Sequence, residues 1–217
     1  MTTINSRQAA GKGSQARRGW SRRSFIGAAA LIALHSAMPG QAAVLESLDP
    51  RDAPSPRQRK LMRLVSDLVI PATDTPGAGT VGAGDFAILA LAHGLEGTRR
   101  PLPAPVAAAL QPFVRADQSL DHVRWLEHAL DPKWLSRPRA QQHTALAALD
   151  AAAFKGDSTA QPWRAIKGLI LTGYYTSEIG GSQELLYELV PGRFDPKVPI
   201  TPETRAFSSD WTAVDFG

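Results

Sequence analysis

The sequence predicts a mainly α fold: a single helical domain of about five to seven helices, with irregular loops and a proline-rich C-terminal tail. Apolar residues recur at intervals of three and four along most of the chain. No alternating run of apolar and polar residues exceeds a few positions, so extended strands are not expected. With 217 residues, of which 43% are hydrophobic, the chain can bury a core without disulfide or metal staples.

The first helix is predicted to begin at Pro56. Ser55 is a favourable N-cap residue, and Gln58 three positions later completes a capping box. Pro71 ends the helix, and a loop rich in glycine, threonine and proline runs from Ala72 to Gly84. The helix presents one apolar stripe, made of Leu61, Leu64, Val65, Leu68 and Val69.

Further helices are expected along the rest of the domain. Gly94 and Gly97 end a second helix, and Ser158 with Gln161 forms a second capping box ahead of a late helix. From Pro191 the pattern dissolves into a proline-rich tail. The segments with helical spacing are Phe86 to His93, Val106 to Val114, Leu120 to Leu130, residues 139–154, and Trp163 to Ile170.

The distribution of charge argues against a nucleic-acid partner. The formal net charge is +4, but six of the 24 lysines and arginines lie in the first 23 residues, and every acidic residue lies at Glu46 or later. Beyond residue 42, 18 basic residues therefore face 20 acidic ones. A nucleic-acid binder needs its basic residues on the folded domain, so no nucleic-acid binding is expected.

Residues 1–42 have the composition of an export signal, and residues 43–217 are expected to form the helical domain. A polar, basic segment precedes a short apolar run from Ala28 to Ala37. This run is well short of the ~20 residues that a helix needs to span a bilayer. Small residues at the end of the segment predict cleavage after Ala42, with Ala43 as the second choice.

The paired arginines of this leader predict a particular export route. Ser21, Arg22, Arg23 and Phe25 resemble the twin-arginine translocation motif. The alternative is an ordinary secretory signal that contains two adjacent arginines. The twin-arginine pathway carries folded cargo, and it is used mainly when a cofactor must be inserted before export.

The chain itself shows no pattern for holding a cofactor or a metal. Gly77 to Gly82 match G-x-G-x-x-G, but a dinucleotide site needs a β-strand running into the first glycine, and here a helix ends at Pro71. The segment is therefore interpreted as a flexible loop between two helices. His122 and His128 lie on opposite sides of a helix, and no cysteine is present for zinc, iron–sulfur or haem attachment.

Two groups of polar residues remain as candidates. Asp67, Asp74 and Asp85 flank the glycine loop as a possible carboxylate pair, although Asp74 in Thr-Asp-Thr-Pro is more simply an Asx-turn residue. The second group is a candidate partner interface, because tyrosine buries area while keeping a polar tip. The alternative is that a tyrosine caps the core. The interface candidates are Trp163, Tyr174, Tyr175 and Glu178.

Three parts of the chain together resemble the gluconate 2-dehydrogenase subunit 3 family. They are the twin-arginine leader, the phrase LVIPATDTPGA from Leu68 to Ala78, and the phrase LTGYYTSEIG from Leu171 to Gly180. The resemblance extends from about residue 60 to the C-terminus, nearly all of the domain. It brings no catalytic residues with it.

The resemblance implies a non-catalytic small subunit in a periplasmic complex associated with the inner membrane. The partners it implies are a large flavoprotein dehydrogenase that carries FAD, a cytochrome c subunit that carries haem c, and the twin-arginine translocase. The small subunit would supply the export address for a large subunit that lacks one. The substrate, whether sugar acid, sugar or polyol, stays open.

Two alternatives stand beside this hypothesis. One is a stand-alone periplasmic enzyme with acid–base residues drawn from Asp74, Asp85, Tyr174 and Glu178, which would have to converge in one pocket. The other is an export-linked assembly chaperone that leaves the mature enzyme.

Overall fold

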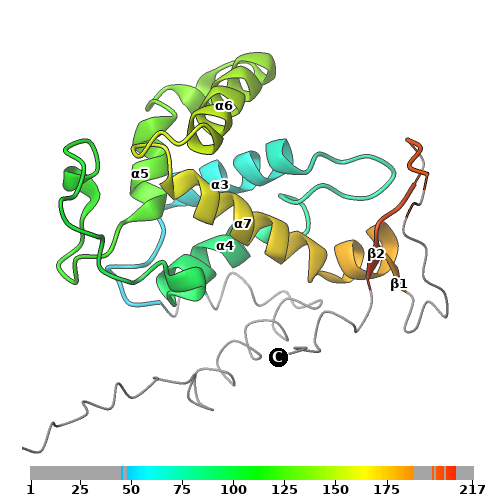
Figure 1. Cartoon of the computed structure of the whole chain (residues 1–217), viewed down its shortest axis with the longest axis horizontal. Coiled ribbons are helices and arrows are strands. Elements are labelled where there is room, and N and C mark those ends of the chain that lie inside the picture. The colour runs from blue at the N-terminus through cyan, green and yellow to red at the C-terminus, as the bar shows by residue number, and fades with distance from the viewer. Residues whose placement is uncertain (1–44, 46–47, 188–196, 198, 203, 209–217) are drawn as a thin grey trace, which may run out of the picture.

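The computed structural model describes residues 45, 48–187, 197, 199–202 and 204–208. These residues form one mainly helical domain, as predicted (Figure 1). The predicted leader, its motif at Ser21 to Phe25 and its cleavage positions Ala42 and Ala43 lie outside the described residues. The helices are α3 (Pro56–Val69), α4 (Ala83–Ala92), α5 (His122–Ala129), α6 (Arg139–Phe154) and α7 (Pro162–Tyr175), with 3₁₀ turns at Leu95–Gly97, Gln111–Phe113 and Trp134–Ser136 and a π-helical turn, η4, at Gly180–Glu184.

Helix α7 lies at the centre of the domain and packs against α3, α4, α5 and α6 (Figure 1). Its apolar stripe is fully covered: Ile166, Leu169 and Ile170 have no exposed surface. Burying a side chain of this size contributes about 1.5–3 kcal/mol. No helix in the described part of the chain has the length and apolar character needed to cross a bilayer.

Helix α3 begins as the sequence predicts. The Ser55 hydroxyl accepts a hydrogen bond from the Gln58 amide at 3.2 Å, and the Gln58 side chain accepts one from the Ser55 amide at 2.9 Å. These two bonds satisfy amides that the helix start would otherwise leave unpaired. The helix ends at Val69, so the predicted boundary at Pro71 is confirmed.

Two predicted local structures are wrong. Residues 106–114 form only a short 3₁₀ turn at Gln111–Phe113, because Pro112 lies inside the segment and removes a backbone donor. The capping box at Ser158 and Gln161 is absent: α7 begins at Pro162 without a side-chain cap. The Gln161 side chain instead donates to the Ala153 carbonyl at 2.9 Å and ties α7 to the end of α6.

The C-terminal segment returns to the domain where the sequence predicted no regular structure. Strand β1 (Leu186–Tyr187) pairs in parallel with β2 (Phe207–Ser208), and Leu186 is opposite Phe207. Both strands lie next to η4, beyond the C-terminal end of α7 (Figure 1). A pairing of two residues per strand is too short to leave an alternating pattern in the sequence.

The glycines of the loop between α3 and α4 allow the loop to pack directly on α3. A Cβ at Gly79 would lie 2.3 Å from the carbonyl oxygen of Arg63 and 2.6 Å from the Asp67 carboxyl carbon. The Gly79 amide donates to Asp67 Oδ1 at 2.8 Å. Gly82, the N-cap of α4, has a φ of 86°, which favours glycine. Close packing and turn geometry therefore account for this G-x-G-x-x-G pattern.

Replacing Gly79 with alanine is expected to lower the free energy of unfolding by about 1–3 kcal/mol, because the new methyl group overlaps the α3 backbone. The matched control is Gly168→Ala. Gly168 lies inside α7 with nothing within 4 Å of its would-be Cβ, so alanine should raise stability by up to about 1 kcal/mol. Urea unfolding followed by circular dichroism measures both, and equal shifts would contradict the packing explanation.

Candidate partner-binding site

The two sequence phrases that carry the family resemblance meet in space. We call their contact the junction, made of residues 70–82 and 171–184. The Thr75 hydroxyl donates to Glu184 Oε2 at 2.7 Å and lies 3.3 Å from the Tyr174 hydroxyl. The Tyr174 hydroxyl also donates to the Pro76 carbonyl at 3.3 Å. Side-chain hydrogen bonds thus connect the loop after α3 to the end of α7 and to η4.

Glycine allows the close approach at the α7 side of the junction. A Cβ at Gly173 would lie 2.7 Å from the Phe86 ring, so α7 and α4 pack closely here. A Cβ at Gly180 would lie 2.0 Å from the Tyr174 carbonyl oxygen. The Ser177 hydroxyl donates to that carbonyl at 2.6 Å and accepts from the Gly180 amide at 3.1 Å. The chain therefore leaves α7 in a tight turn whose backbone groups are bonded.

The two adjacent tyrosines have different environments. Tyr174 is 1% exposed and belongs to the core, whereas Tyr175 is 40% exposed. Their rings meet edge to face with centroids 5.2 Å apart. Burial raises the pKa of Tyr175, and the nearby Glu184 and Tyr174 raise it further. Glu178, one turn further along, is exposed. Tyr175 and Glu178 are thus the two predicted interface residues that face outward.

Trp163 lies in the interior. It is 1% exposed, and its indole nitrogen donates to Asp150 Oδ1 at 2.6 Å. Lys167 donates to the same oxygen at 2.8 Å. Burial raises the pKa of Asp150, but these two hydrogen bonds outweigh it, and the pKa lies below its ordinary value. Trp163 therefore joins α7 to α6 and offers almost no free surface to a partner.

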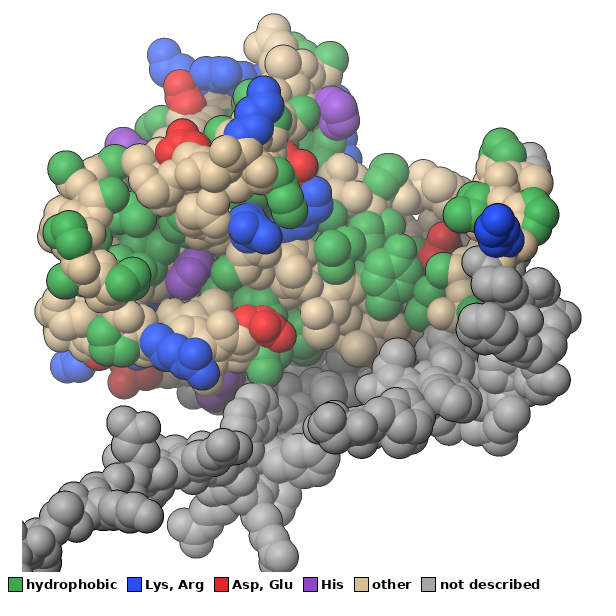
Figure 2. All heavy atoms as spheres, in the orientation of Figure 1, with side chains coloured by type: hydrophobic (Ala, Val, Ile, Leu, Met, Phe, Trp, Pro, Cys, Tyr) green, Lys and Arg blue, Asp and Glu red, His purple; other side chains and the backbone are tan. Residues whose placement is uncertain are grey.

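Exposed apolar side chains gather around the end of α7. Figure 2 shows hydrophobic side chains collected over the C-terminal half of this helix. Sequence reasoning missed the contributions of β1 and β2, because an exposed leucine or phenylalanine in a short irregular segment has no local signal. The large hydrophobic side chains exposed in this part of the chain are Tyr175 (40%), Leu186 (37%), Ile200 (85%) and Phe207 (57%).

The three aspartates around the glycine loop have separate partners. Asp67 accepts from the Gly79 amide, and Asp85 pairs with Arg59, whose Nη2 lies 2.9 Å from Asp85 Oδ2. Asp74 is exposed and accepts from the Thr73 hydroxyl at 3.0 Å. The predicted Asx turn at Asp74 is wrong, because the residue two positions on is Pro76, which has no amide N–H to donate to the carboxylate.

The histidines do not assemble into a metal site in the part of the chain that the structure describes. No group of three or more histidine, aspartate or glutamate side chains there is placed to hold a metal ion. His122 is partly buried at the start of α5, with Nδ1 3.1 Å from the Leu120 carbonyl oxygen. Burial lowers the pKa of His122 to about 4, so its ring is neutral near pH 7.

Replacing Tyr174 with phenylalanine tests the junction. The change removes the hydroxyl that bonds to Pro76 and contacts Thr75, and it should lower the free energy of unfolding by about 1–2 kcal/mol. Tyr175→Phe is the matched control, since its ring is partly exposed and stability should change by less than about 0.5 kcal/mol. Urea unfolding of both variants measures the difference, and equal stability would show that the Tyr174 bonds contribute nothing.

Comparison with known proteins identifies a family whose matched range includes the residues that form the junction. The family model described as gluconate 2-dehydrogenase subunit 3 matches residues 56–192, more than half of the chain. No curated protein and no solved structure matches this chain. The matched range begins at the first residue of α3 and contains both segments of the junction. The chain belongs to the gluconate 2-dehydrogenase subunit 3 family.

Proposed function

We propose that this chain is the non-catalytic small subunit of a membrane-associated, flavin-dependent dehydrogenase complex of the gluconate 2-dehydrogenase type. It stabilises the flavoprotein subunit and escorts it through twin-arginine export to the periplasm. Oxidation of a sugar acid, sugar or polyol takes place on the FAD of that partner, and a cytochrome c subunit carries the electrons onward. Family membership supports the coarser part of this proposal, a place in a multi-subunit dehydrogenase complex.

The observation that carries the proposal is the exposed apolar surface held by the junction. Tyr175 lies at the end of α7, and contacts among Tyr174, Thr75 and Glu184 hold this helix end in place. A ring held in this way loses little conformational freedom on binding, which favours affinity. Tyrosine is also enriched among the residues that dominate protein interfaces. A stable complex needs about 1,200–2,000 Å² of buried surface, so the neighbouring Leu186 and Phe207 are expected to take part.

The leader supports the escort role. Arg22 and Arg23 precede an apolar run too short to span a bilayer, which is the order of an export signal for folded cargo. A flavoprotein folds around its cofactor before export, and a partner with its own address can carry it. The small subunit is thus proposed to bind the large one before either leaves the cytoplasm.

Deleting this chain in its native host tests the escort role. The flavoprotein subunit should remain in the cytoplasm or be degraded, because it has lost its export address and its stabilising partner. Fractionation followed by flavin fluorescence and dye-linked dehydrogenase activity measures the distribution. An active flavoprotein in the periplasm of the deletion strain would overturn the proposal. Recovery of both chains in equal amounts from the mature complex separates a subunit from a transient chaperone.

Replacing Arg22 and Arg23 together with lysine tests the export route. The twin-arginine machinery reads the arginine pair, so the double variant and its flavoprotein passenger should both stay in the cytoplasm. The matched control is Arg17→Lys with Arg18→Lys, a second arginine pair in the same leader outside the motif. Immunoblots of periplasmic fractions measure the result. Normal export of the Arg22/Arg23 variant would indicate an ordinary secretory signal instead.

A further inference from the structure

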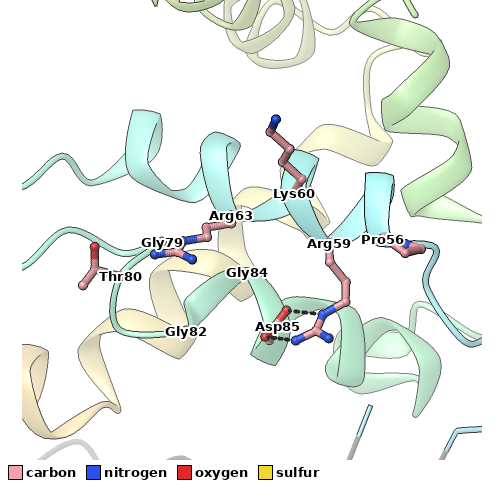
Figure 3. Close-up of a pocket in the computed structure, with 9 residues that line it drawn as sticks. All are labelled: Pro56, Arg59, Lys60, Arg63, Gly79, Thr80, Gly82, Gly84 and Asp85. Carbon is pink, nitrogen blue, oxygen red and sulfur yellow. Dashed lines mark hydrogen bonds and ion pairs between the residues drawn. The ribbon is translucent and has the colours of Figure 1, made fainter. Parts of the chain in front are cut away.

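A basic cleft lies between α3 and the loop that leads into α4. Its volume is about 480 Å³. One wall is the outer face of α3, with Arg59, Lys60 and Arg63, and the other is the chain from Gly79 to Asp85 (Figure 3). Figure 3 shows Arg63 reaching along the loop toward Gly79, while Lys60 points outward from the same helix. Arg59 and Arg63 of α3 therefore reach toward the opposite wall, and Lys60 lies at the rim of the cleft.

The charges of this cleft do not balance. Asp85 is the one acidic residue that lines it, and Asp85 is paired with Arg59. Lys60 and Arg63 are exposed, and neither has an ion-pair partner among the described residues. The chain beyond residue 42 carries more acidic than basic residues. The cleft thus carries a local excess of two positive charges, although the chain beyond residue 42 has a negative formal charge.

We infer that this cleft receives an acidic segment of the flavoprotein subunit, held by Lys60 and Arg63. The inference rests on the proposed function and adds the chemistry of the contact. A carboxylate-bearing chain fits the charge of the cleft, and an arginine can bind a carboxylate through two parallel hydrogen bonds. Because both cations are exposed, they attract the partner before contact and speed association more than they add to final affinity.

The position of the cleft favours the same partner that the junction binds. The loop between α3 and α4 contributes Thr75 and Pro76 to the junction and Gly79 to Asp85 to the cleft. A single partner that covers the loop can reach both, with apolar contacts at Tyr175 and ionic contacts at Arg63. This arrangement resembles the general anatomy of interfaces, in which an apolar centre is bordered by a polar, charged rim.

The shape of the cleft favours a peptide segment over an anionic membrane. A bilayer presents a flat surface and is bound best by a flat or convex basic face with apolar residues that insert. Here Arg59 and Arg63 lie along a hollow with Lys60 at its rim, and the residues that line the hollow include three glycines, one threonine and no large apolar side chain. A protruding acidic segment enters such a hollow, whereas lipid headgroups in a plane do not.

Charge reversal tests the inference in the full chain. Lys60→Glu with Arg63→Glu should lower the amount of flavoprotein that co-purifies with the tagged chain by about tenfold. Lys60→Gln with Arg63→Gln should cause a smaller loss of co-purified flavoprotein. This neutral variant keeps the test valid if the charge-reversed variant misfolds. The matched control is Arg100→Glu with Lys155→Glu, two exposed cations outside the cleft. Thermal unfolding checks that every variant remains folded.

Two further measurements, one at high salt and one with lipid vesicles, complete the experiment. The difference between wild type and reversed variant should shrink at about 1 M salt, where screening acts within a few ångströms. Equal co-purification of flavoprotein by both would overturn the inference while leaving the proposed function intact. Salt-sensitive binding of the wild type to phosphatidylglycerol vesicles, lost on reversal, would overturn it in favour of a membrane site. If the wild type co-purifies with no flavoprotein, the proposed function fails, and the inference with it.

Discussion

The burial of α7 is the constraint on which the rest of the structure depends. Within the part of the chain that the structure describes, this helix contacts all four of the other α-helices, and Ile166, Leu169 and Ile170 of its apolar stripe have no exposed surface. Contacts made at the C-terminal end of α7 are therefore supported by a helix that the core holds rigidly in place. Tyr174 is the last core residue of the stripe, and Tyr175 is the first residue after it that faces solvent. A single step along the helix thus leads from the packed interior to the surface proposed to bind a partner.

The loop between α3 and α4 gives the molecule its second organising feature. It packs on α3 through Gly79, bonds to α7 through Pro76 and to η4 through Thr75, and forms one wall of the basic cleft. The glycine, threonine and proline residues of this loop form no helical pattern in the sequence. The same residues let the loop contact α3, α7 and η4. Packing and hydrogen bonding therefore account for the glycines of this loop. The interface proposed here is built on that loop.

Much of the fold follows from sequence, since amphipathic spacing and capping act locally. The start of α3 at Pro56, after its N-cap Ser55, and the end of α6 at Phe154 are set by residues within a few positions. One prediction fails because tertiary context decides: Gln161 bonds to Ala153 instead of capping α7. The helix predicted over 106–114 fails for a local reason, because Pro112 interrupts it. Residue type marked Tyr174 and Tyr175 as candidates, and Tyr174 is the buried one because it continues the helical spacing of Ile166 and Ile170. The contacts of the tyrosines with residues 70–82 and with η4 depend on the fold.

The bond from the Tyr174 hydroxyl to the Pro76 carbonyl joins residues 98 positions apart. Contacts of such separation require the closure of most of the intervening chain, so they form only when the domain is nearly complete. The surface around Tyr175 consequently does not exist in a partly folded chain in which the two segments have not met. A partner that recognises this surface would select finished molecules, and assembly would itself act as a quality check before the proposed export.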